Sequence, residues 1–140
     1  MDDNKTAIFQ DFARKAKEKI EEKKKKKTKQ LYVRDSDVTI TIRGISDEEF
    51  LEITEMKDMT EIERDQYMAY YACPELQEAS AELVKDGTLT EKTRYKIAEM
   101  FSAVDRAAIV RDITRLSGLS GEPSVVDAKE HISELKEVKN

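Results

Sequence analysis

The 140-residue sequence has few of the residues that interrupt or cross-link a chain. It contains four glycines, two prolines, one cysteine, one histidine and no tryptophan. So few turn-forming residues argue against a sandwich or barrel of many short strands. The lone Cys73 cannot form an internal disulfide, which is typical of a reducing compartment. No window approaches the roughly 18–20 apolar residues of a membrane-spanning helix. We therefore expect a cytoplasmic protein, made mainly of helices, with no membrane association.

The residue sets that most catalytic, cofactor and metal sites require are also missing. His131 has no second histidine or cysteine near it in the sequence, so a zinc site or a Cys–His catalytic pair lacks its members. Four glycines at positions 44, 87, 118 and 121 cannot form a phosphate-binding loop. Acidic pairs such as Glu48 and Glu49 fall at expected helix starts, where the helix dipole explains them. We expect no enzyme activity, no cofactor and no metal, and a function in binding another protein.

The net charge of −5 is unevenly distributed. Residues 1–30 hold 11 Lys and Arg against 6 Asp and Glu, and the remainder holds 14 against 24. The acidic remainder would repel phosphates, so only the amino-terminal arm could attract nucleic acid. The run from Lys23 to Lys27 contains no arginine or aromatic residue. A solvated helix end is its simpler interpretation, and contact with nucleic acid is the alternative.

The hydrophobic pattern changes period twice along the chain. Spacings of three and four residues predict a helix over 4–27. Strict alternation then predicts two strands, at 31–34 and 38–43, joined by a turn at 35–37. After Gly44 the spacing is helical again. Capping boxes at Ser46 and Thr60 predict two helix starts, Pro74 predicts a third, Thr88 or Thr90 a fourth and Ser102 a fifth.

These elements predict a mainly α fold with a small β-hairpin (α+β): a long basic helix, the hairpin, then a compact bundle of about five short helices. We expect a basic arm at 1–30, a compact domain at 31–119, and a linker with a charged terminal segment at 120–140. The linker prediction rests on residues 120–124. A two-stranded ribbon is marginal in water, so its apolar face is expected on helices or on the strands of a second copy.

Three groups of residues are candidates for binding a partner. The stripe on the first helix includes Phe9 and Phe12, and forms either core or a partner-facing seam. Tyr67, Tyr70 and Tyr71 crowd one helix and cannot all lie on one face, so at least one is expected outside the core. The terminal segment carries a thin stripe of Ala128, Ile132, Leu135 and Val138, which suits a frayed helix, a docking helix or a disordered tail.

The order of these segments resembles the tail assembly chaperones of long-tailed phages, in particular the XkdN-like group of prophages in Gram-positive bacteria. The resemblance covers roughly residues 20–120. It rests on the lysine-rich stretch, on VTITIRGISDEE at 38–49, on CPEL at 73–76, on LVKDG at 83–87 and on the last helix ending LSGL at 116–119. The chain departs from the family's usual pattern in having Gly44 instead of proline and no tryptophan.

The resemblance implies a non-enzymatic chaperone that binds the long helical tape measure protein and keeps it soluble while the tail tube assembles. Related genes in this family often yield a second, longer product by ribosomal frameshifting; if that holds here, this chain is the short form. Two other functions fit the residues: a DNA-associated or regulatory prophage protein that uses the Lys23–Lys27 arm, and a structural tail or head completion protein.

Overall fold

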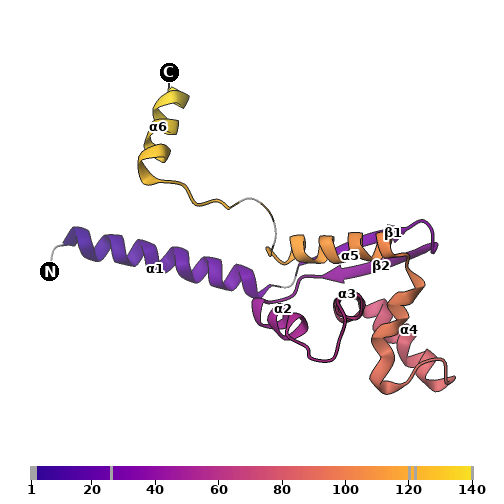
Figure 1. The fold of residues 1–140 in the computed structure, drawn as a ribbon. Helices are drawn as coiled ribbons and strands as arrows, with labels where there is room; N and C mark the ends of the chain where they lie inside the picture. The colour runs from indigo at the N-terminus through magenta and orange to yellow at the C-terminus, as the bar shows by residue number, and fades with distance from the viewer. Residues whose placement is uncertain (1–2, 26, 120, 122, 140) are drawn as a thin grey trace.

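The computed structural model describes residues 3–25, 27–119, 121 and 123–139, and shows two helices that extend from a compact body (Figure 1). The predicted fold class is confirmed: the chain is mainly helical, with one two-stranded antiparallel sheet. In chain order the elements are α1 (Asp3–Lys24), β1 (Thr28–Val33), β2 (Val38–Arg43), α2 (Asp47–Thr54), α3 (Glu61–Tyr71), α4 (Pro74–Lys85), the 3₁₀ helix η1 (Glu91–Met100), α5 (Ala103–Leu116) and α6 (Ala128–Lys139).

The hairpin has one buried face because its apolar residues alternate. Leu31 pairs with Ile40, and the side chains of Val33, Ile40 and Ile42 enter the core. The residues between them face outward, as the period of a strand requires. At the tip, Asp37 adopts φ 51°, and its carboxylate accepts a hydrogen bond from the Tyr32 hydroxyl at 2.8 Å. Ordinary turn chemistry therefore accounts for this aspartate.

Helix α3 lies at the centre of the body and contacts α2, α4, η1 and α5. Its start at Thr60 and the start of α2 at Ser46 are both full capping boxes, as predicted. The core beneath the sheet is formed by apolar side chains from the hairpin and from every helix of the body. The body is thus a single packed unit, and α1 and α6 lie outside it.

The structure differs from the sequence expectations in detail. The first helix ends at Lys24 rather than at residue 27, and β1 begins at Thr28, within the segment assigned to the arm. The fourth helix is a 3₁₀ helix, kinked at Thr93. Helical spacing of Leu76, Ala79 and Leu83 predicts an apolar stripe on α4, but Ala79 is exposed and Ser80 is buried instead. Burial of Ser80 is tolerated because its hydroxyl donates a hydrogen bond to the carbonyl oxygen of Arg94 at 2.9 Å.

Candidate partner-binding surfaces

The apolar stripe of α1 is exposed. Phe9 and Phe12 keep 64% and 74% of their surface in solvent, and Ile8 and Ile20 are similarly open. We call these four residues the α1 surface; the sequence stripe had omitted Ile8. Helical periodicity places all four on one side of the helix. Of the two sequence interpretations, core or seam, the structure excludes the core. An exposed apolar face of this kind is a candidate contact site.

Charged residues border the α1 surface and stabilise the helix itself. Arg14 forms ion pairs with Asp11 at 2.8 Å and Glu18 at 3.1 Å, and Lys15 pairs with Asp11 at 3.1 Å. Such pairs, three or four residues apart, each contribute about 0.2–0.5 kcal/mol to a helix. Helical periodicity puts Lys19 within the range of the apolar face, Lys15 and Glu22 on one border, and Lys17 and Lys24 on the other. The border is therefore predominantly basic. Lys26, within the predicted lysine run, lies outside the described residues.

Tyr67, Tyr70 and Tyr71 pack against the core, and none of them is exposed. The Tyr67 ring lies 6.2 Å from Tyr70, 6.0 Å from Tyr71 and 6.0 Å from Tyr95, measured between centroids. Burial is the main cause that raises the pKa of Tyr67. All three are half-buried: they pack against the core but belong to none of its buried positions, which is consistent with the expectation that at least one lies outside the core. The cluster is a packing feature of the body.

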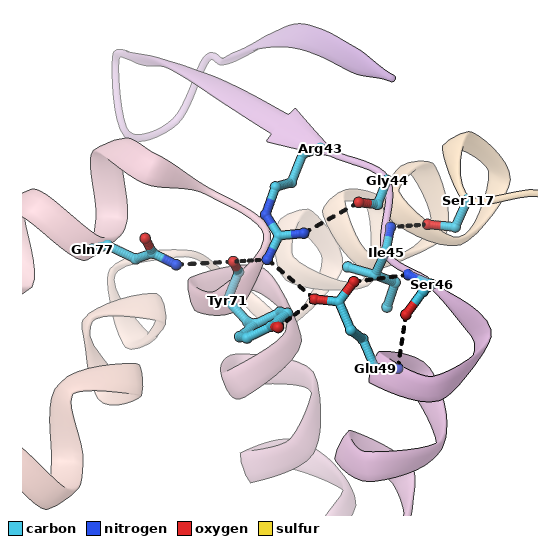
Figure 2. Close-up of polar contacts among 8 residues, drawn as sticks. All are labelled: Arg43, Gly44, Ile45, Ser46, Glu49, Tyr71, Gln77 and Ser117. Carbon is cyan, nitrogen blue, oxygen red and sulfur yellow. Dashed lines mark hydrogen bonds and ion pairs between the residues drawn. The ribbon is translucent and has the colours of Figure 1, made fainter. Parts of the chain in front are cut away.

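A polar network joins β2, α2, α3 and α4 beside these tyrosines (Figure 2). The Arg43 guanidinium lies 3.5 Å from the Glu49 carboxylate and 4.6 Å from the Tyr71 ring centroid, and donates to the carbonyl oxygen of Tyr71. Glu49 also accepts a hydrogen bond from the Tyr71 hydroxyl. Burial raises the pKa of Glu49, but the bonds from Tyr71 and Ser46 outweigh it, so the pKa lies below its usual value. The network holds the four elements together.

The carboxyl-terminal segment forms a helix, α6, rather than an extended tail. Ile132 and Leu135 are 54% and 49% exposed on it, so the second predicted stripe is also uncovered. The Asp127 carboxylate accepts a bond from the Lys129 amide at 2.8 Å and begins the helix. The side chain of Val138 lies outside the described residues, as do Ser120 and Glu122 of the predicted linker.

A groove that the sequence did not indicate runs between β1 and α5. Residues 31–35 form one wall, Asp105, Ala108, Ile109 and Asp112 form the other, and the volume is about 380 Å³. Ala108 also lines an adjoining shallow hollow of about 610 Å³, whose other lining residues are Ala103, Val104, Ala107 and Arg111. The only hint of this groove in the sequence is the spacing of alanines four residues apart on α5. Alanine at that spacing is common in any helix, so it does not predict a groove.

Cys73 and His131 lie in different parts of the described structure, Cys73 in the core and His131 on α6. Cys73 is buried, and this burial raises the pKa of its thiol to about 11, so the thiol is protonated near neutral pH. His131 is exposed on α6. Within the described part of the chain, no group of His, Cys, Asp or Glu residues is arranged to hold a metal ion.

Comparison with known proteins adds no identification. Neither a family model, a curated protein nor a solved structure matches this chain. None of the described helices is both long and apolar enough to cross a membrane.

Proposed function

We propose that this chain is a non-enzymatic chaperone of phage tail assembly that binds the helical tape measure protein through the α1 surface. The observation that supports the proposal is the exposure of Phe9 and Phe12 on a helix that projects from the body. Large aromatic side chains are costly to leave in water unless a partner covers them during function. The segment order that resembles the XkdN-like chaperones supplies the identity of the partner.

The form of α1 fits a helical client. A straight amphipathic helix offers a stripe of large side chains that can pack along the apolar stripe of another helix. The basic border favours a client helix whose own stripe is flanked by Asp and Glu. Two copies of α1 would instead bring lysine borders together, which disfavours pairing of α1 with itself. The client would thus lie along α1 while the body remains folded.

Co-expression with the tape measure protein tests this proposal. With the unaltered chain, the client is expected to be soluble and to co-purify. The double substitution Phe9→Ser with Phe12→Ser should abolish both effects without unfolding the body. Ile62→Ser is the matched control, because Ile62 is another exposed apolar residue, 59% open, on α3. Its substitution should leave the complex intact.

Two further variants separate the competing interpretations. Ile132→Ser with Leu135→Ser removes the α6 stripe, and selective loss of the client in that variant would place the binding site on α6 instead. Replacing Lys23, Lys24, Lys25 and Lys27 by glutamine addresses the nucleic-acid alternative. Steeply salt-dependent DNA binding that this variant loses, together with no effect on the client, would contradict the chaperone proposal.

A further inference from the structure

The outer edges of β2 and β1 differ in whether their backbone groups are hydrogen-bonded to the rest of the chain. On the outer edge of β2, the Thr41 amide donates to the Glu75 carboxylate at 2.9 and 3.0 Å, and the Arg43 amide donates to the carbonyl oxygen of Ala72 at 2.9 Å. These bonds close the edge from the α3–α4 junction. On the β1 edge, no such bond from Gln30 or Tyr32 is found among the described residues. One edge of the sheet is capped and the other is open.

The register shows which backbone groups the open edge presents. Because Thr41 and Arg43 point their amides away from β1, their ladder partners Gln30 and Thr28 point theirs away from β2. Tyr32, two residues beyond Gln30, has the same orientation. The edge therefore offers the amides and carbonyls of alternate residues to an incoming strand. Natural proteins usually protect such an edge, because it is a template for pairing with another chain.

The charged side chains around this edge are mainly acidic, opposite in charge to Lys29 of β1. The helical wall of the groove carries Asp105 and Asp112, and Asp35 lies at its end. β1 itself carries one charged residue, Lys29, and the residues that flank it, Lys27 and Arg34, are also basic; Arg34 lines the same groove. Lys29 of the same chain reaches Asp112 only at 3.9 Å, the limit for an ion pair. The three aspartates around the groove are complementary to Lys29 and to the basic flanks of β1 in a second copy.

From these observations we infer that two copies of this chain associate by antiparallel pairing of their β1 edges, forming a continuous four-stranded sheet. A twofold axis through Leu31 pairs Gln30 with Tyr32 of the other copy in both directions. Lys29 is then the diagonal neighbour of the other copy's Asp35, within reach of a long side chain. The shallow apolar hollow at Val104 and Ala107 adjoins this edge and is available for further contact. The interface is isologous and closes at two copies.

Substitution of Gln30 by proline tests the pairing directly. Proline removes an amide that makes no bond to β2, and edge strands tolerate it at such positions. Sedimentation equilibrium over a concentration series should show a reversible dimer for the unaltered chain and for Gln30→Val, and a monomer for Gln30→Pro. Phe12→Ser should remain dimeric, because the α1 surface takes no part. A monomeric unaltered chain, or a dimer that survives Gln30→Pro but not Phe12→Ser, would overturn the inference.

Amide hydrogen exchange supplies a readout that does not depend on a variant folding correctly. The amides of Gln30 and Tyr32 should exchange rapidly when the chain is dilute and slowly when it is concentrated. The amide of Leu31, which points toward β2, should be protected at both concentrations. Equal, concentration-independent exchange of Gln30 and Tyr32 would show that nothing pairs with this edge.

Discussion

At the scale of single residues, several polar groups that the body buries wholly or in part join its elements. Arg43 and Glu49 connect β2 to α2 and α3, and Ser80 connects α4 to η1. Glu75 has a different role, because its carboxylate binds a backbone amide on the outer edge of β2 and so closes that edge of the sheet. Its carboxylate takes the place that a third strand would occupy beside β2. A side chain at the start of a helix thus sets which edge of the hairpin is available.

The pH dependence of stability should report this role of Glu75. Burial raises the pKa of Glu75, but the hydrogen bonds from Thr41 outweigh it and lower the pKa below its usual value. A carboxyl with a lowered folded-state pKa stabilises the fold above its unfolded value of about 4.3, and this stability is lost as the pH falls through the folded value. Glu75→Gln should lower the free energy of unfolding at neutral pH by about 1–2 kcal/mol. It should also weaken the acid dependence.

Urea denaturation at a series of pH values measures both effects. Glu78→Gln is the control, because Glu78 lies exposed on the same helix. It should leave the free energy of unfolding almost unchanged at neutral pH. An identical acid profile for Glu75→Gln and the unaltered chain would show that the carboxylate contributes nothing to holding β2.

At the scale of elements, the sequence predicted those whose signals are local. Alternating Val38, Ile40 and Ile42 indicated a half-buried strand, and the capping boxes at Ser46 and Thr60 indicated helix starts; both are confirmed. The exposed stripe of α1 could not be told from core, because periodicity identifies an apolar face but not what covers it. For Tyr67 and its neighbours the sequence also left core and contact surface undecided, and the helices around α3 leave these side chains half-buried.

The groove beside β1 was not predictable from the sequence for the same reason. Its walls come from residues more than 70 positions apart, such as Leu31 and Ala108. No local pattern joins them, and alanine on a helix signals only good helix propensity. The kink of η1 at Thr93 was also not predicted. It coincides with a local capping interaction, in which the Thr90 amide donates to Thr93 Oγ1 at 2.9 Å.

Stability measurements should separate the contact role of α1 from that of the core helices. Phe12→Ala should change the free energy of unfolding of the body by less than about 0.5 kcal/mol, because Phe12 is already in water. Ile113→Ala, at a fully buried position on α5, should cost about 2–5 kcal/mol. Chemical denaturation followed by tyrosine fluorescence measures both, since the tyrosines report on the body. A large loss for Phe12→Ala would mean that α1 packs on the body after all.

At the scale of the whole molecule, the two proposed surfaces lie on different elements and support each other. A dimer formed through β1 has one α1 helix on each copy and therefore presents two α1 surfaces. A long client with many amphipathic stretches would then be held at two points, and the second contact forms at the high effective concentration set by the first. Loss of the dimer should therefore weaken the hold on the client without removing the site. Loss of the α1 surface should remove the site itself.

Dissociation rates of the client complex distinguish these two effects. Gln30→Pro should release an immobilised multi-helix client fragment roughly 10–100-fold faster than the unaltered chain, since only avidity is lost. On a fragment with a single amphipathic helix, the two proteins should behave alike. Phe9→Ser with Phe12→Ser should fail to bind either fragment. Equal release of the longer fragment by Gln30→Pro and the unaltered chain would mean that the α1 arms act singly, and that the sheet edge serves some purpose other than holding the client.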